Sequence, residues 1–309
     1  MNLLYRIYFL LPRGFLGYKF DVLMYKTLKF LFDLFVVHFF KITINKHPYA
    51  LNTKEREKKI IFSLTSFPDR IDTIWICIET LMRQSLKPDK IILWLAKEQF
   101  PEQKLPNSLL NLENKGLSIR WCDEDLRSHK KYYYAFQEFP NDIIITFDDD
   151  VYYPNNVTKE LYKLHKQNPD CICSNKVNKM LFADNRLSPY NKWIHNYKSN
   201  FVPSYELVQI GISGVLYPPN CFTKEVFQKE VFRKLCFYAD DLWLKVCSLL
   251  NNKKVITSKY FNKELVPIKY TQRVGLFKIN VFDDKNDSQL KNVLTHFDID
   301  IYDFINQDK

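Results

Sequence analysis

The sequence predicts an α/β protein with a mainly parallel sheet and helices on both faces of that sheet. Short apolar runs alternate along the chain with segments in which apolar residues recur at helical spacing. Runs that are apolar throughout are typical of parallel strands buried on both faces. The 309 residues, 46% of them hydrophobic, also supply enough apolar material for a packed core, which excludes a disordered or low-complexity chain.

The alternation begins at residue 59 and predicts the elements in order. Strands are expected over residues 60–64, 90–95, 117–122 and 142–147, and helices over 71–82, 108–114, 129–139, 155–167 and 242–250. We therefore assign residues 59–309 to one α/β domain. The chain has six glycines and contains neither GxGxxG nor GxxxxGK[ST], which disfavours dinucleotide-binding Rossmann proteins and P-loop NTPases.

Residues 1–58 form a separate segment, rich in Leu, Phe and Tyr but interrupted by charges. Within residues 1–45 the longest charge-free run, 34–40, is far shorter than the about 20 apolar residues of a spanning helix, and no small-residue cleavage site marks a signal peptide. Helical spacing places an apolar side, formed by Phe20, Leu23, Met24, Leu28, Leu31, Phe32, Phe35, Val36 and Phe39, opposite a side with Lys19, Lys26, Lys29 and Asp33. Such a basic amphipathic helix either lies on an anionic membrane surface or packs on the main domain or a partner.

The charge distribution argues against nucleic acid as a partner. Of the net charge of +10, the larger part belongs to residues 1–58, which hold ten Lys and Arg against four Asp and Glu.

The seven cysteines are odd in number and include no CxxC pair, so buried thiols in a reducing compartment are expected rather than a disulfide framework or a zinc ribbon. We expect a cytoplasmic protein that is peripheral on the inner membrane face if the N-terminal helix binds lipid.

Polar side chains follow three of the four expected strands. They are Thr65, Ser66, Asp69 and Arg70 after the first strand, Asp123, Glu124 and Asp125 after the third, and Asp148, Asp149 and Asp150 after the fourth. Ligands of such sheets bind outside the carboxyl ends of the strands. This edge of the sheet is therefore the predicted binding site.

The triplet Asp148-Asp149-Asp150 is the strongest chemical signal in the sequence. Three adjacent carboxylates repel one another, and the repulsion grows in a low dielectric, so a compensating cation is expected. Oxygen ligands suit Mg²⁺ or Mn²⁺, which would bridge to a substrate diphosphate. Alternation along an extended chain predicts that Asp148 and Asp150 share a direction while Asp149 points elsewhere. The alternative is an Asp-rich turn that caps the following helix.

Two segments carry a family resemblance: Ile61-Phe62-Ser63-Leu64-Thr65-Ser66-Phe67-Pro68-Asp69-Arg70 and Phe147-Asp148-Asp149-Asp150-Val151-Tyr152-Tyr153-Pro154. Over about residues 59 to 300 the chain resembles bacterial nucleotide-sugar-dependent glycosyltransferases of the GT-A type, similar to glycosyltransferase family 2 and to enzymes of capsular and cell-surface polysaccharide synthesis. In that family a DxD motif holds the metal that binds the diphosphate of the donor. The resemblance implies a nucleotide-sugar donor, with UDP as the expected nucleotide, and a glycan or lipid-linked glycan acceptor.

The same resemblance assigns roles to individual positions. Asp150 is the expected metal ligand, and Asp148 is expected to reach the ribose, the sugar or the metal, with Asp149 beside the donor. The remaining donor contacts would come from Thr65, Ser66, Arg70 and Asp123 around the base and ribose and from Lys130 or Lys131 at a phosphate.

A second acidic pair, Asp240-Asp241, lies directly before an apolar pattern of helical period. Two acids at a helix start serve as caps in many proteins. The resemblance offers a second role, since inverting GT-A enzymes place a catalytic base in a short acidic motif at a helix start. Asp241 would then accept the proton of an acceptor hydroxyl and Asp240 would orient the acceptor, or the two roles are exchanged; inversion itself stays open. Gly211 and Gly214 either allow close approach to a ligand or form an ordinary turn.

Three other functions agree less well with the sequence. A haloacid-dehalogenase-like phosphatase also uses Asp-x-Asp after a strand, but that strand is the first of the domain, whereas the triplet here falls late. A polymerase palm has a Tyr-x-Asp-Asp string on a β-hairpin, whereas helical periodicity follows Tyr238-Ala239-Asp240-Asp241. A non-catalytic, membrane-tethered sugar-binding module would not need both acidic clusters.

Overall fold

The computed structural model describes residues 18–44, 51–259, 265–269, 271 and 285–306. Its centre is a seven-stranded sheet with the strand order β12-β6-β11-β4-β1-β2-β3. These strands are β1 (Ile60–Thr65), β2 (Lys90–Ala96), β3 (Leu117–Cys122), β4 (Ile143–Phe147), β6 (Ile172–Ser174), β11 (Val215–Tyr217) and β12 (Val255–Thr257). Only β11 runs antiparallel to its neighbours in this sheet. The predicted mainly parallel α/β fold is confirmed.

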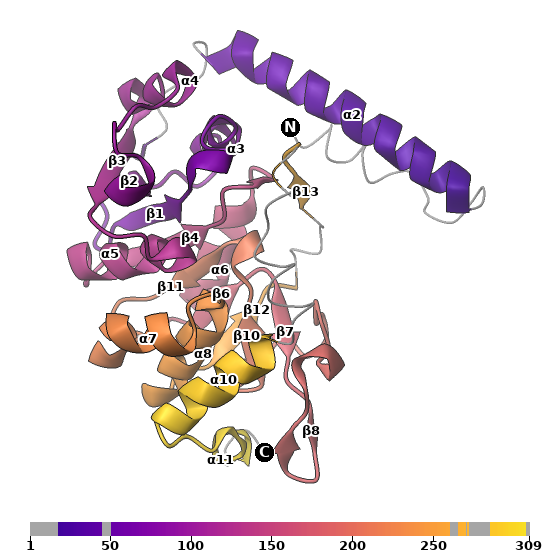
Figure 1. Cartoon of the computed structure of the whole chain (residues 1–309), viewed down its shortest axis with the longest axis vertical. Helices are drawn as coiled ribbons and strands as arrows, with labels where there is room; N and C mark the ends of the chain where they lie inside the picture. The colour runs from indigo at the N-terminus through magenta and orange to yellow at the C-terminus, as the bar shows by residue number, and fades with distance from the viewer. Residues whose placement is uncertain (1–17, 45–50, 260–264, 270, 272–284, 307–309) are drawn as a thin grey trace.

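Short strands and helices surround the sheet (Figure 1). Three two-stranded ladders pair β5 (Val151–Tyr152) with β13 (Val266–Pro267), β7 (Val177–Lys179) with β10 (Leu207–Gln209), and β8 (Phe182–Ala183) with β9 (Arg186–Leu187). The helices are α2 (Tyr18–Thr43), α3 (Ile74–Met82), α4 (Asn107–Leu110), α5 (Lys130–Glu138), α6 (Val157–Gln167), α7 (Lys229–Leu235), α8 (Asp240–Leu250), α10 (Lys285–His296) and α11 (Ile301–Asn306). Of the segment 270–280, only Thr271 lies within the described residues.

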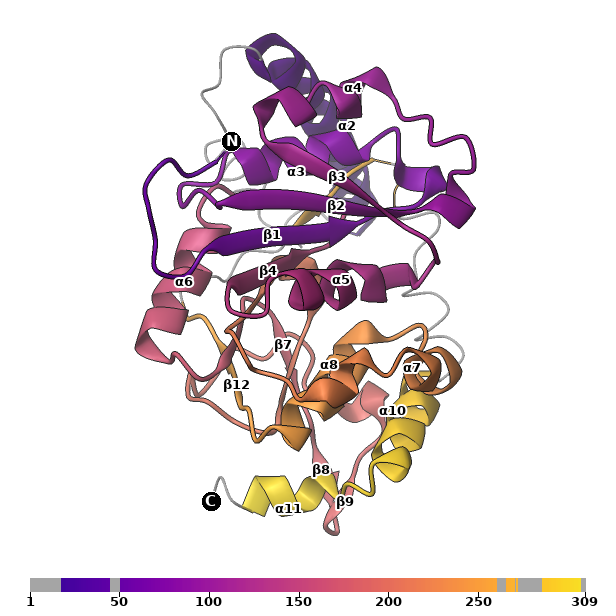
Figure 2. The same ribbon diagram turned by 90° about the vertical axis from the view of Figure 1, so that its left-hand side faces the viewer.

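The central strands are buried on both faces, as their uniformly apolar sequences predict. Phe62 and Leu64 of β1 join the core beneath α2, α3 and α6, whereas Ile61 joins Ala135 of α5 on the opposite face. In Figure 2, α3 lies above the strands and α5 below them. Alternate side chains of one apolar strand therefore pack in two separate hydrophobic cores, one on each face of the sheet.

The N-terminal segment forms the expected helix, α2, but its orientation differs from the prediction. Phe32, Val36 and Phe40 are buried in the core shared with the sheet, while Leu31 and Phe35, which the sequence placed on the same apolar side, are 53% and 52% exposed. No helix in the described part of the chain is long and apolar enough to cross a membrane.

Asp33, predicted to lie among lysines on the polar side of α2, is also buried. Its Oδ1 accepts a hydrogen bond from the hydroxyl of Tyr152 at 3.0 Å, and Lys29 forms an ion pair with the same carboxylate. These two partners satisfy the carboxylate away from water, so the helix can turn this side toward the domain. Sequence periodicity could not reveal a donor that lies 119 residues away.

Candidate active site

The carboxyl ends of β1 and β4 place the first set of site residues side by side. The two strands are parallel neighbours, with Leu64 opposite Phe147, so the residues that follow them leave the sheet together. Ser66 donates its hydroxyl hydrogen bond to Asp149 Oδ2, and the guanidinium of Arg70 forms an ion pair with Asp149 Oδ1. The predicted convergence of polar residues at this edge is thus present for the first and fourth strands.

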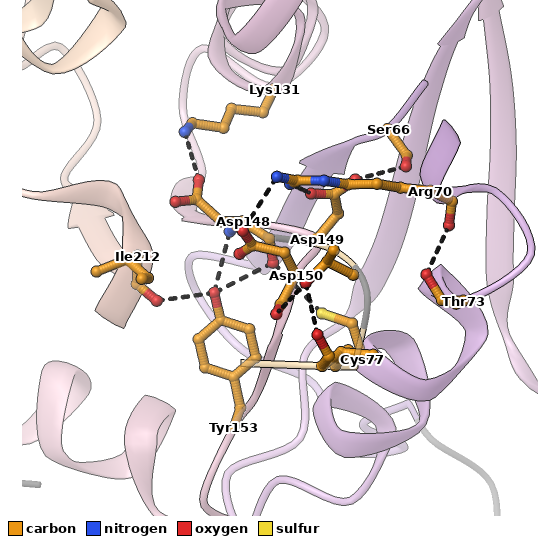
Figure 3. A network of polar contacts seen from close by, with 12 residues as sticks. Ser66, Arg70, Thr73, Cys77, Lys131, Asp148, Asp149, Asp150, Tyr153 and Ile212 are labelled. Atoms are coloured by element: carbon orange, nitrogen blue, oxygen red, sulfur yellow. Dashed lines mark hydrogen bonds and ion pairs between the residues drawn. The ribbon is translucent and has the colours of Figure 1, made fainter. Parts of the chain in front are cut away.

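Arg70 also reaches the last member of the triplet, since its Nη2 lies 3.2 Å from Asp150 Oδ2. Burial opposes its charge, but Asp149 and Asp150 outweigh that effect and raise the pKa of Arg70. Figure 3 shows Asp149 and Asp150 facing the guanidinium while Asp148 points toward Lys131. The alternation expected for an extended chain is therefore wrong here, because residues 148–150 form a bend.

Lys131 connects the two acidic clusters. Its Nζ lies 2.8 Å from Asp148 Oδ1 and 2.9 Å from Asp240 Oδ2, and its side chain is only 5% exposed. Burial disfavours the ammonium, but the carboxylates of Asp148, Asp240 and Asp241 outweigh that effect and raise the pKa of Lys131 well above its ordinary value. Clusters that are 92 residues apart in the sequence thus share one cation.

Two buried contacts hold the start of α5 so that Lys131 points into the site. The hydroxyl of Ser63 in β1 donates to the carbonyl oxygen of Lys131 and accepts a hydrogen bond from Trp94 Nε1 at 2.9 Å. His129 stacks on Phe232, with ring centroids 4.3 Å apart, and its Nε2 lies 3.0 Å from the carbonyl oxygen of Cys236. Because burial lowers the pKa of His129 to about 4, the ring is neutral at pH 7, and Nε2 can donate to that carbonyl.

Asp240 and Asp241 form the first turn of α8, as the sequence predicted. Burial opposes ionisation of Asp240, yet Lys131 holds the pKa of this carboxyl below its ordinary value. Burial and the charge of Asp240 raise the pKa of Asp241 from 3.8 to about 8. The helix also disagrees with a polymerase palm, in which the Tyr-x-Asp-Asp string lies on a β-hairpin.

Gly211 lies where the acidic clusters meet. Its backbone N–H donates to both carboxylate oxygens of Asp241 at 3.2 Å. A Cβ atom at this position would lie 3.1 Å from Lys131 Nζ, 3.3 Å from Asp148 Oδ1 and 3.4 Å from Asp241 Oδ1. Of the two interpretations of this glycine, close approach within a functional site is the one that the contacts support.

Tyr153 and Cys77 fix the backbone of the triplet, and the sequence argument assigned neither a role. The hydroxyl of Tyr153 accepts a hydrogen bond from the N–H of Asp148 at 3.0 Å and lies 3.0 Å from the carbonyl oxygen of Ile212 (Figure 3). Cys77 Sγ lies 3.3 Å from the carbonyl oxygen of Asp148. The Tyr-Tyr-Pro string after the triplet was the available signal for Tyr153, whereas nothing in the sequence placed Cys77 next to Asp148.

Three predicted donor residues have polar contacts outside this cluster. The hydroxyl of Thr65 donates to the carbonyl oxygen of Trp94 at 2.8 Å. Asp123, with 86% of its side chain exposed, pairs with Lys97 at the surface. Lys130 is buried, but its ammonium is bound by Asp125 and by Gln99 Oε1 at 3.0 Å rather than by the triplet.

The described site residues do not form a complete set of metal ligands. The sequence argument expected a metal to balance the triplet, and the structure adds two protein cations, Arg70 and Lys131. Four carboxylates, those of Asp148, Asp149, Asp150 and Asp240, pair with these two cations, so acidic groups are in excess. Among the described residues no group of three His, Cys, Asp or Glu side chains could hold a metal by itself. A metal held here by Asp148 or Asp150 would need further ligands from substrate or water, because the two carboxylates face different cations.

No protein-family model and no curated protein sequence matches this chain. Three solved structures resemble its fold, each with low sequence identity. S. aureus TarS 1-349 is 13% identical and matches 67% of this chain with a TM-score of 0.41; the match spans 59% of that solved chain. A 4-diphosphocytidyl-2C-methyl-D-erythritol synthase is 12% identical over 70% of this chain and 95% of its own, with a TM-score of 0.41. The mannosyltransferase PcManGT from Pyrobaculum calidifontis, solved with GDP-Man and Mn²⁺, is 11% identical over 74% of this chain and 61% of its own, with a TM-score of 0.39.

Proposed function

We propose that this chain transfers a sugar from a nucleotide sugar to the hydroxyl group of a glycan acceptor, in the synthesis of a bacterial surface polysaccharide. The observation that carries the proposal is the ion-pair bridge from Asp148 through Lys131 to Asp240. It joins a carboxylate cluster suited to a metal-bound diphosphate to a second carboxylate pair suited to proton transfer. The motif resemblance of residues 61–70 and 147–154 supplies the substrate class.

The donor half of the site consists of the triplet and the cations beside it. Arg70 and Lys131 are the cations on which phosphate charge can be placed as the bond to the sugar breaks. Asp148 and Asp150 are the proposed ligands of Mg²⁺ or Mn²⁺, which, when bound, would neutralise the leaving diphosphate. We leave Thr65, Asp123 and Lys130 outside the proposed donor site, because their polar atoms are engaged elsewhere.

Asp241 is the proposed base. Its carboxyl group is held by Gly211, and its raised pKa of about 8 makes it a proton acceptor that is ionised once the pH passes about 8, whereas Asp240 is paired with Lys131. The oxygen of the acceptor forms a bond to C1 of the sugar while the bond from C1 to the diphosphate oxygen breaks. The proton of the acceptor hydroxyl passes to Asp241, and the electron pair of the broken bond leaves with the nucleoside diphosphate. This displacement inverts the configuration at C1.

Thermal unfolding of the full chain with UDP, GDP or CDP, each with and without Mn²⁺, tests the donor half. Stabilisation by one nucleotide that requires the metal is the expected result, since a ligand that binds the native state raises its stability. Asp150→Asn should abolish the metal-dependent part. Asp69→Asn is the matched control, because Asp69 is a neighbouring but exposed carboxylate. A metal-dependent shift that survives in Asp150→Asn would contradict the assignment.

A further inference from the structure

The solvent-facing half of α2 is mainly apolar among its described side chains. Ten described side chains of this helix are exposed, and six of them are large hydrophobic residues: Leu23, Phe30, Leu31, Leu34, Phe35 and Ile42, each more than half exposed. At 100° per residue they fall within one half of the helix. Between Leu23 and Ile42 the surface is about 28 Å long at the rise of an α-helix. We call these six residues the apolar strip.

The apolar strip cannot turn inward without breaking specific contacts on the other half of the helix. Phe32 packs edge-on against Tyr152 with ring centroids 5.2 Å apart, and Asp33 accepts the hydrogen bond from the same tyrosine. Near the end of the helix, the guanidinium of Arg83 lies over the ring of Phe40 at 4.7 Å and donates to Thr43 Oγ1 at 2.9 Å. These contacts fix which half of α2 faces the domain.

The exposed charged side chains that the structure describes on α2 have one sign. The other exposed side chains described on α2 are Lys26, Thr27, His38 and Lys41. Lys269, from the segment after β13, lies with its Nζ 5.0 Å from the centre of the Phe30 ring. The only carboxylate among the described side chains of α2 is that of Asp33, which is buried. Among the described side chains, a surface of Leu, Phe and Ile with exposed lysines and no exposed acid is complementary to anionic lipid.

We propose that the apolar strip of α2 docks the protein on an anionic membrane surface, with the helix in the plane of the interface. Exposed patches of this kind mark interaction surfaces in soluble proteins. A second copy is a less favourable occupant, because a symmetric interface through this half would place the lysines of one chain against those of the other. Tyr152 follows Asp150 by two residues, so the docked helix is tied directly to the segment that carries the triplet. This proposal does not depend on the proposed transfer reaction.

Sedimentation of the full chain with lipid vesicles tests the proposal. Vesicles of phosphatidylcholine with phosphatidylglycerol should bind the protein, and those of phosphatidylcholine alone should bind it weakly. The triple variant Leu31→Ser, Leu34→Ser, Phe35→Ser should bind at least a hundredfold more weakly, since each lost apolar side chain costs about tenfold. The matched control replaces three exposed apolar residues elsewhere, Leu110→Ser, Ile194→Ser and Val202→Ser, and should bind within about twofold of the wild type.

A second variant separates the contribution of the lysine charges to vesicle binding from that of the apolar side chains. Lys26→Gln with Lys41→Gln should lower binding to the anionic vesicles by about fivefold for each lysine and leave weak binding to neutral vesicles unchanged. Wild-type protein that does not bind anionic vesicles, or a serine triple variant that binds them like the wild type, would overturn the proposal. So would sedimentation equilibrium showing a dimer that the triple variant abolishes while vesicle binding is absent.

Discussion

The ammonium of Lys131 lies 2.9 Å from Oδ2 of Asp240, and this ion pair joins the start of α5 to the start of α8. The same ammonium also binds Asp148, which follows β4. One side chain therefore holds together three elements that carry the candidate site. Its removal should affect both the donor half and the acceptor half at once.

Lys131→Met should reduce donor affinity and turnover together. Two carboxylates would lose their shared partner, and breaking a buried ion pair costs about 3 kcal/mol or more of stability. Lys131→Arg keeps the charge and should recover part of the stability. The neighbouring Lys130→Met is the matched control, because Lys130 is equally buried but pairs with Asp125. Steady-state kinetics and thermal unfolding of all three variants measure these effects. A full loss of turnover in folded Lys130→Met would contradict the assignment of Lys131, and not Lys130, to the site.

The turnover number, kcat, should rise as the pH increases through about 8. Asp241 can accept a proton only when it is ionised, and burial together with Asp240 raises its pKa to about 8. A pH profile of kcat with a saturating donor should therefore show an ascending limb in this range. Asp241→Asn should lower kcat by about a hundredfold or more while leaving donor affinity nearly unchanged. Equal losses in donor affinity and kcat would argue against a base.

Protein stability should respond to the same group with the opposite sign. Between the ordinary value of 3.8 and about 8, folded Asp241 retains a proton that the unfolded chain has lost. The unfolding free energy should therefore fall as the pH rises from about 4 to about 8. Asp241→Asn cannot titrate, so this part of the slope should vanish when denaturant unfolding is measured across the range. An unchanged slope in the variant would assign the effect to other groups.

Gly211→Ala should impair activity more than stability. The new methyl group would press on the ends of flexible side chains, Lys131 and Asp241, at 3.1 Å and 3.4 Å. Displacement of these groups should lower kcat by about tenfold, with little change in the melting temperature. Gly116→Ala should show the reverse, because its φ of 105° is strained for alanine and Leu51 leaves no room. If both variants lost stability equally, Gly211 would be a structural turn only.

The two halves of α2 should differ in their contribution to folding. Phe40→Ala removes a buried ring from the core and should cost about 3–5 kcal/mol. Leu34→Ala, on the exposed half, should change stability by less than about 0.5 kcal/mol. Denaturant unfolding of both variants measures the difference. A small effect of Phe40→Ala would mean that α2 is dispensable for the folded domain.

Local sequence patterns predicted part of the fold and part of the candidate site. The apolar runs predicted the parallel strands, because a strand buried on both faces must be apolar at every position. The position of the triplet after β4, and of the acidic pair at the start of α8, followed from the same periodicities. The expectation that Ser66 and Arg70 would approach the triplet followed from the rule that parallel strands end at a common edge.

Tertiary structure decided which charges meet. Repulsion within the triplet indicated that a cation was needed, but the sequence could not show that Arg70 and Lys131 are paired with it, since ion pairs depend on distances between elements far apart in the chain. Likewise, the helical period of α2 predicted an amphipathic helix but not which half faces the domain. That choice rests on Tyr152, whose hydroxyl makes burial of Asp33 favourable and leaves Leu31 and Phe35 in solvent.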